Sequence, residues 1–267
     1  MPEKFEVRHL DIAYDERLIV KDLNIHIPMG KITVLVGANG SGKSTILKAM
    51  ARLVKPKGGG VFLDGESIHH KSTREVARQL AILPQNPSSP EGMTVYELVS
   101  YGRFSSQTGF GSLTPDDRQI IAWAIEVTGI AAFCELPLNQ LSGGQRQRAW
   151  IAMALAQQTD ILFLDEPTTF LDMAHQLEVL QLLYRLNRKE KRTIVMVVHD
   201  LNHAARYADH LIAVRQGKVL QQGAPRQVMT PEVLREIFGV EADIFPDPRT
   251  GIPLCIPYGL STMPANF

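Results

Sequence analysis

The most constraining feature of this 267-residue chain is a glycine-rich octapeptide that follows a short, continuously apolar segment. The apolar segment is Ile32–Val36, and residues 37–44 read Gly-Ala-Asn-Gly-Ser-Gly-Lys-Ser. A strand that is buried on both faces needs apolar residues at every position, so the segment predicts a central strand of an α/β sheet. A helical pattern, Ser44–Leu53, follows at once. The glycines are therefore expected at a strand-to-helix turn.

The octapeptide fits the pattern G-x-x-x-x-G-K-S, which is typical of phosphate-binding loops. Glycines let the backbone curl so that its N–H groups converge on phosphate oxygens, and the start of the following helix favours the same negative charge. Lys43 can reach the outer phosphates, and the Ser44 hydroxyl can bind Mg²⁺. We predict a phosphate site made of Gly37, Ala38, Asn39, Gly40, Ser41, Gly42, Lys43, Ser44 and Thr45.

A second apolar segment, Ile161–Leu164, ends in two consecutive carboxylates, Asp165 and Glu166. Beside a phosphate loop, Asp165 would hold Mg²⁺ through its water shell, and Glu166 would polarise an attacking water. Phosphoryl transfer depends mainly on positioning and charge neutralisation, so few residues suffice for it.

A third motif is expected at the start of a helix. Residues 141–145 read Leu-Ser-Gly-Gly-Gln. Ser142 is a preferred type of helix cap, and we predict a helix from Gln145 to Gln157. Two glycines beside a hydroxyl would expose backbone N–H groups at the helix start, which predicts a second anion site.

The rest of the chain alternates short apolar segments with helical patterns. Residues 5–27 alternate apolar and polar side chains, which predicts antiparallel strands with one exposed face. The region at about residues 87–158 lacks strand patterns and predicts an inserted helical subdomain. Gln216-Gly217 predicts a hairpin turn, and the tail from Asp243, rich in proline and glycine, predicts extended coil packed on the core. Further short strands are predicted at residues 61–63, 81–83, 161–164 and 194–198.

Charge and composition limit the possible partners. Lysine plus arginine and aspartate plus glutamate both number 28, so the formal net charge is zero, and we expect no nucleic-acid partner. The first residues lack the pattern of a signal peptide, and no apolar run is long enough to cross a bilayer. Any membrane role is therefore expected to come through a partner chain.

The motif at 141–145 reads LSGGQ, the signature of the ABC ATPase family, which the chain resembles over roughly residues 5–257. The resemblance implies a P-loop NTPase fold: an ABC ATPase cassette with a RecA-like α/β core, an antiparallel β subdomain and an inserted helical subdomain. The implied ATP-binding domain spans residues 3–240, with its helical subdomain at about 87–158, and residues 241–267 form a C-terminal tail.

The same resemblance implies further roles. Tyr14 would stack on the adenine of ATP, and Gln85 would contact Mg²⁺ and the attacking water. Asp172 matches the D-loop, and His199 matches the histidine that contacts the γ-phosphate. The full expected set is Glu166, His199, Gln85 and Lys43 for catalysis, Tyr14, residues 37–45, Leu141, Ser142, Gly143, Gly144, Gln145 and Asp172 for ATP, and Ser44, Gln85 and Asp165 for Mg²⁺.

Members of this family work as pairs. The resemblance implies a head-to-tail homodimer in which each ATP lies between Lys43 of one copy and Ser142–Gln145 of the other. It also implies integral membrane permease subunits, an indirect link to a substrate-binding protein, and a peripheral place on the cytoplasmic face of the cell membrane. We expect the segment Met93–Arg103 to form the groove that receives a permease helix.

Several stretches are similar to one subgroup, the importers of ferric siderophores, haem and cobalamin. They are residues 146–157, residues 168–172, His175-Gln176, residues 199–202 and the tail at 245–253. We expect ATP hydrolysis that powers ferric siderophore import, with cobalamin and haem left open as cargo. Non-transport ABC proteins and iron–sulfur assembly factors are the alternatives from other classes. Those in translation or DNA repair usually carry two cassettes or long coiled-coil insertions, and this chain has neither.

Overall fold

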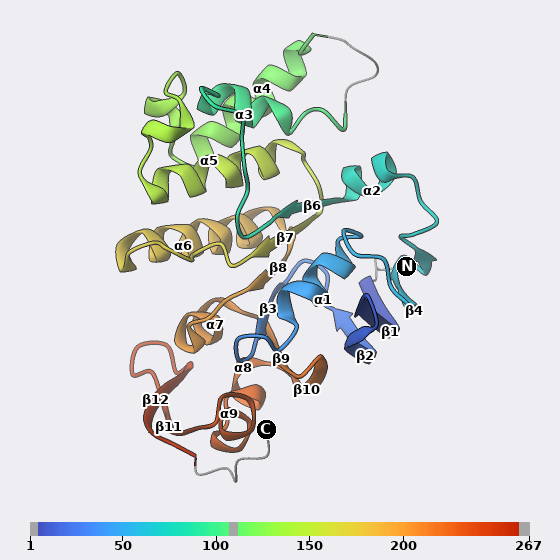
Figure 1. The fold of residues 1–267 in the computed structure, drawn as a ribbon. Coiled ribbons are helices and arrows are strands. Elements are labelled where there is room, and N and C mark those ends of the chain that lie inside the picture. Colours follow the sequence, from blue (N-terminus) through green and yellow to red (C-terminus); the bar gives the residue numbers. More distant parts are fainter. Residues whose placement is uncertain (1–4, 107–111, 262–267) are drawn as a thin grey trace. The chain divides into compact units, whose positions relative to one another are not determined.

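A computed structural model describes residues 5–106 and 112–261 of the chain (Figure 1). The chain divides into two compact units. The first joins the stretch up to His70 to the stretch from Val195 onward, and the second is Lys71–Ile194. Residues 3–4 of the expected ATP-binding domain, 107–111 of the expected helical subdomain and 262–267 of the expected tail lie outside the described residues.

The first unit begins with an antiparallel sheet in the strand order β2-β1-β4-β5. The side chains of β1 and β2 alternate between buried and more exposed positions, as predicted for strands with one wet face. The strands are β1 Phe5–Tyr14, β2 Arg17–Ile27, β4 Gly58–Leu63 and β5 Glu66–Ser67.

The α/β core of the first unit has the strand order β10-β9-β3-β8. Every residue of β3 (Ile32–Val36) and of β8 (Thr193–Val197) is buried, which explains their continuous apolar sequences. β3 runs parallel to β9 (His210–Arg215), and β10 (Lys218–Gly223) returns antiparallel to β9. The turn between β9 and β10 has positive φ at Gln216 and Gly217, as a two-residue hairpin turn requires, so the predicted hairpin is confirmed.

Two helices follow strands of this core. Helix α1 (Lys43–Met50) follows β3 through the glycine-rich loop, and α7 (Leu201–Tyr207) follows β8. Helix α1 is shorter at its C-terminal end than the predicted Ser44–Leu53. Leu53 N–H donates to Lys48 O at 2.8 Å in the turn that ends the helix.

The prediction of extended coil at the C-terminal end is wrong. Helices α8 (Pro225–Val228) and α9 (Pro231–Phe238) lead into a two-stranded antiparallel sheet of β11 (Val240–Pro246) and β12 (Pro253–Leu260), where extended coil was predicted. The Asn202 side chain of α7 explains how this hairpin is held. Its Nδ2 donates to the Cys255 carbonyl at 3.1 Å, and its Oδ1 accepts from the Cys255 N–H at 2.7 Å.

The second unit holds two parallel strands, β6 (Leu80–Leu83) and β7 (Ile161–Asp165), paired in register from Leu80↔Ile161 to Leu83↔Leu164. Helix α2 (Thr73–Gln79) precedes β6, and α6 (Met173–Glu190) follows β7.

The remaining part of the second unit is helical. It contains α3 (Val95–Tyr101), α4 (Pro115–Val127), the 3₁₀ turns η1 (Ala131–Phe133) and η2 (Leu138–Gln140), and α5 (Gly143–Ala156). Among the described residues from 87 to 158, the only β pairing is an isolated bridge between Thr94 and Pro137.

A buried ion pair joins the turn after α3 to helices α4 and α5. Arg103 Nε donates to Asp117 Oδ1 at 2.8 Å, and Arg103 Nη1 donates to the Ala156 carbonyl at 2.7 Å. Within residues 5–106 and 112–261, no helix combines the length and the apolar character needed to cross a bilayer.

Candidate functional site

The residues predicted to form the site divide between the two units. The first unit holds Tyr14, the loop 37–45 and His199. The second unit holds Gln85, residues 141–145, Asp165, Glu166 and Asp172.

The glycine-rich loop connects the end of β3 to the start of α1, as predicted. Gly42 precedes the helix with φ 101°, a left-handed backbone that favours glycine. The Lys43 side chain turns back into its own loop, where Nζ donates to the Gly37 carbonyl at 2.8 Å and to the Ala38 carbonyl at 2.9 Å. Lys43 is only 5% exposed, so its positive charge is held inside the curl of the loop.

The loop also packs closely against the β9–β10 hairpin. A Cβ atom at Gly37 would collide with the Val214 carbonyl oxygen and would lie 2.8 Å from Ser41 Oγ. The N–H of Gly217 donates to the Ser41 carbonyl at 2.8 Å. Ser41 Oγ itself is buried and has no hydrogen-bond partner among the described residues. Because a buried hydroxyl without a partner is costly, this atom is poised to bond a ligand in the loop.

Two other residues predicted to contact ATP, His199 and Tyr14, lie in the first unit. Val198 N–H donates to the Leu35 carbonyl at 3.4 Å, so His199 leaves β8 next to the strand that carries the phosphate loop. The His199 side chain is exposed. Tyr14 lies at the end of β1 and is 48% exposed, which leaves its ring accessible for stacking. The roles of both residues toward ATP stay predictions.

The paired carboxylates end β7 in the second unit. Asp165 is only 2% exposed, and Glu166 follows it with φ 54°. A left-handed backbone at a residue other than glycine costs about 1–3 kcal/mol and persists only where the surrounding structure holds it. The strain is consistent with a carboxylate that the fold aims in one direction.

Side chains of Gln85 and Thr169 hold the Glu166 carboxylate. Gln85 Nε2 donates to Glu166 Oε2, and Thr169 Oγ1 donates to the same oxygen at 3.0 Å. Gln85 follows β6, and because β6 and β7 are parallel neighbours, both residues lie at the carboxyl end of the strands, where α/β proteins place ligands. Sequence reasoning missed Thr169, whose only signal is a hydroxyl three residues after the carboxylate.

The signature motif forms a capped helix start. Ser142 Oγ accepts from the Gln145 N–H at 3.3 Å, and Gln145 Oε1 accepts from the Ser142 N–H at 3.0 Å, which completes a capping box. The predicted cap is confirmed, but α5 begins at Gly143 instead of Gln145. The two glycines therefore form the first helical turn, with Gly143 exposed and Gly144 buried.

The structure brings the D-loop next to this helix start. A Cβ atom at Gly143 would lie 3.5 Å from Leu171 Cδ2. Asp172 caps α6, where its Oδ1 accepts from the His175 N–H at 2.9 Å and from His175 Nδ1 at 2.8 Å. These bonds, the backbone one above all, lower the pKa of Asp172 and keep it charged. The sequence pattern Asp-x-x-His at a helix start was the signal for this contact, and sequence reasoning did not use it.

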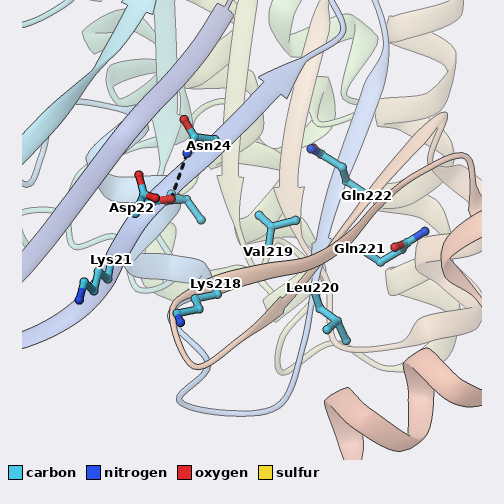
Figure 2. A pocket seen from close by; sticks show the side chains of 9 residues that line it. Lys21, Asp22, Asn24, Lys218, Val219, Leu220, Gln221 and Gln222 are labelled. Atoms are coloured by element: carbon cyan, nitrogen blue, oxygen red, sulfur yellow. Dashed lines mark hydrogen bonds between the residues drawn. The ribbon is translucent and has the colours of Figure 1, made fainter.

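A groove of about 640 Å³ lies between β2 and β10 (Figure 2). Within it, Asn24 Nδ2 donates to the Asp22 carbonyl at 3.1 Å, and the His9 ring nitrogen bonds the Asp22 carboxylate at 2.7 Å and lowers its pKa. None of the predicted site residues lines this groove, so we do not assign ATP to it. The lining is Lys21, Asp22, Leu23, Asn24, Lys218, Val219, Leu220, Gln221 and Gln222.

Comparison with known proteins identifies the family. The ABC transporter family profile matches residues 20–169. The iron(3+)-hydroxamate import ATP-binding protein FhuC of Bacillus subtilis is 58% identical over 251 residues, which are 94% of this chain and 93% of that protein.

Two solved structures are similar in fold. One is assigned to the metal-chelate type of ABC transporters, in an inward-facing conformation. It has a TM-score of 0.84 and 26% identity, and the match covers 97% of this chain and 98% of that one. The other is a dimeric ATP-binding cassette in a post-hydrolysis state bound to ADP and Pi, with a TM-score of 0.72, 29% identity, and coverage of 82% of this chain and 98% of that one. The phosphate loop, the signature helix start and these relatives together place the chain in the ABC transporter family, among its nucleotide-binding ATPase subunits.

Proposed function

We propose that this protein hydrolyses ATP between two copies of itself and thereby powers a membrane permease that imports ferric siderophores. One observation carries the proposal: the chain has two helix starts prepared for an anion. The loop before α1 holds a buried Lys43 charge and a Ser41 hydroxyl that has no partner within residues 5–106 and 112–261, and Ser142 with two glycines begins α5.

The phosphate loop would bind the β- and γ-phosphates of ATP. Lys43 Nζ now bonds two carbonyl oxygens of its own loop, and an incoming phosphate would offer it a charged partner instead. Charge-assisted hydrogen bonds are roughly twice as strong as neutral ones. The exchange therefore favours the bound nucleotide without a large movement of the lysine.

The available donors suit Mg²⁺. The Ser44 hydroxyl, the Asp165 carboxylate and the Gln85 side-chain oxygen are hard oxygen ligands, the type that Mg²⁺ prefers. Gln85 uses its nitrogen to bond Glu166, so its oxygen is the atom left to turn toward a cation. Mg²⁺ would neutralise charge on the phosphate oxygens, and these residues would hold it.

Glu166 would orient the attacking water. Its carboxylate is fixed by Gln85 and Thr169 and by its own strained backbone, so it does not have to be ordered when ATP arrives. A positioned carboxylate can accept a hydrogen bond from water and align it with the γ-phosphate. His199 and Tyr14 would contact the γ-phosphate and the adenine.

Two oppositely oriented copies would enclose each ATP. Lys43 of one copy and Ser142–Gln145 of the other would contact the same nucleotide, in a two-fold arrangement that buries two ATP molecules. The dimeric relative bound to ADP and Pi supports this assembly. Reversing a closure equilibrium from 1:99 to 99:1 takes about 5.5 kcal/mol, which the γ-phosphate contacts of two ATP molecules can supply.

Motion would pass to the permease through α3. A groove of about 360 Å³ lies along this helix, where Tyr101 is 58% exposed and Phe104 is 76% exposed. Exposed aromatic side chains beside a groove are typical of surfaces that receive an amphipathic helix. We assign this groove to a cytoplasmic helix of the permease, so the subunit would lie on the cytoplasmic face of the membrane. The groove is lined by Tyr96, Glu97, Ser100, Tyr101, Phe104 and Leu113.

The cargo does not touch an ATPase subunit, so ferric siderophore is proposed from the hydroxamate-importing relative. The test is to purify the protein with its permease from membranes, reconstitute both into vesicles with the substrate-binding protein, and measure ATP-dependent uptake of labelled ferric hydroxamate. We expect ferric hydroxamate to be taken up, and cobalamin and haem to be excluded. Glu166→Gln is the control that abolishes hydrolysis. Uptake of cobalamin or haem alone would contradict the cargo, and the lack of any co-purifying permease would contradict transport.

A further inference from the structure

His175 touches two of the predicted motifs at once. It lies in the first turn of α6, and its ring Nδ1 bonds Asp172 Oδ1 at 2.8 Å. The other side of the ring faces the signature helix. A Cβ atom at Gly144 would collide with His175 Cδ2 and would lie 2.7 Å from Cγ and 3.1 Å from Cβ. The imidazole therefore occupies the space that the missing side chain of Gly144 leaves open.

The neighbouring residue completes the contact. Gln176 Nε2 donates to the Leu171 carbonyl at 3.0 Å, so the pair His175-Gln176 holds the side chain of Asp172 and the backbone before it. Leu171 in turn packs beside Gly143. The D-loop and the first turn of α5 are therefore in direct side-chain contact.

The bond also fixes the state of the ring. Asp172 keeps its negative charge, because hydrogen bonds from His175 favour the ionised carboxylate. A carboxylate can only accept, so His175 Nδ1 must carry a hydrogen, whichever state the second nitrogen has. A side chain without a donor at this position would leave Asp172 with backbone donors only.

We propose that His175 is a positioning residue. It holds Asp172 beside the helix start Ser142–Gly144, so that the two together form the surface that contacts the second copy of the chain. This inference rests on the proposed ATP-bound dimer. His175 contacts no nucleotide in this role. It acts through Asp172 and Gly144, so its loss should weaken pairing of the copies without weakening the binding of ATP to the phosphate loop.

The test uses a slow-hydrolysis background, Glu166→Gln, and measures ATP-dependent dimerisation by light scattering. His175→Leu should weaken the dimer about a hundredfold. The bond lies within each copy, so its loss releases Asp172 from the geometry that pairing requires, and a cost of about tenfold per copy applies twice in a two-fold dimer. His175→Asn keeps a nitrogen donor near the position of Nδ1 and should restore dimerisation to within about threefold.

A matched control exists in the chain. His203 stands at the same Asp-x-x-His spacing at the start of α7, but its Nδ1 is 4.0 Å from Asp200 Oδ1, too far for a hydrogen bond. His203→Leu should leave dimerisation unchanged. ATP binding to the monomer and the melting temperature should stay the same in His175→Leu, which separates positioning from unfolding.

Gly144 provides a second measurement. If the His175 ring is the reason why residue 144 must be glycine, Gly144→Ala should impair dimerisation in the parent background. In the His175→Ala background, the same substitution should cause no further loss of dimerisation. Equal losses in both backgrounds would overturn the inference, as would full dimerisation of His175→Leu. If the Glu166→Gln parent itself stays monomeric with ATP, the proposed dimer fails, and this outcome is distinct from failure of the inference about His175.

Discussion

The side-chain amide of Gln85 donates a hydrogen bond to the carboxylate of Glu166 and so links the carboxyl ends of two parallel strands, β6 and β7. Gln85 also begins the segment that leads into the helical part of the second unit. A displacement of that segment would therefore act directly on the orientation of the carboxylate. Thr169 bonds the same oxygen and would resist such a displacement.

Replacing Thr169 with valine removes this donor and keeps the shape of the side chain. We expect kcat for ATP hydrolysis to fall about tenfold, the usual cost of one hydrogen bond to a charged group, while KM for ATP changes less than about twofold. Steady-state ATPase assays measure both constants. Thr169→Ser keeps the hydroxyl and should retain most of the activity. A valine variant with unchanged kcat would show that Glu166 does not depend on this bond.

Replacing Lys43 with alanine removes the buried charge from the phosphate loop. We expect ATP affinity to fall at least about tenfold, because a charge-assisted contact to phosphate is lost. Equilibrium titration with a fluorescent ATP analogue checks this loss. Lys48→Ala, later on the same helix, is the matched control and should bind as the parent does. Equal affinities of the two variants would contradict the phosphate role of Lys43.

Replacing Tyr101 with aspartate puts a charge into the groove along α3. We expect transport in reconstituted vesicles to be lost while ATP hydrolysis by the isolated subunit persists, because a desolvated charge disfavours docking of an apolar helix. Leu53→Asp is the control, since Leu53 has the same exposed fraction, 58%, and lies in the first unit. Normal transport by the Tyr101 variant would exclude this groove as the permease site.

Replacing Arg103 with methionine removes one partner of the buried ion pair with Asp117. We expect a loss of about 3–5 kcal/mol in the free energy of unfolding near neutral pH, because Asp117 keeps its charge without its main partner. Urea denaturation measures the loss. Arg118→Met, an exposed position on α4, should change stability by less than about 0.5 kcal/mol.

The same pair predicts a pH dependence. The Arg103 guanidinium lowers the pKa of Asp117 in the folded chain. A lowered folded pKa stabilises the fold above the ordinary aspartate value of about 3.9, and this contribution disappears as the pH falls through the folded value. The stability difference between the parent and Arg103→Met should therefore be constant above about pH 5 and shrink below about pH 4. A difference that grows in acid would contradict the ion pair.

Much of the fold could be predicted from local sequence patterns. Ile32–Val36 is a strand with the predicted bounds, because burial on both faces leaves a continuous apolar sequence. Gln216-Gly217 forms the predicted hairpin turn, because its backbone needs two consecutive positive φ angles. The local sequence determines the conformation of such features, and no distant residue is needed.

The C-terminal sheet could not be predicted in this way. Proline and glycine argued for coil, but prolines lie opposite each other at the end of the ladder, where Pro246 pairs with Pro253. The anchor is Asn202, whose amide bonds both backbone groups of Cys255. No local pattern shows that an asparagine on a helix will meet a particular residue far along the chain.

In the candidate site, too, some features could be predicted from local sequence and others could not. The phosphate loop and the cap at Ser142 were predictable, because consecutive residues form each of them. The contacts of Thr169 with Glu166 and of His175 with Gly144 depend on how turns and helices pack, which sequence spacing does not give. Residues that position others are thus harder to find than residues that bind directly.

The central claim, that ATP is bound between two oppositely oriented copies, has one direct measurement. It is a crystal structure of Glu166→Gln with ATP and Mg²⁺. We predict a two-fold dimer in which Ser142 and the N–H groups of Gly143 and Gly144 of one copy lie within hydrogen-bond distance of the γ-phosphate held by Lys43 of the other. ATP bound at the phosphate loop with the signature helix start facing solvent would contradict the account.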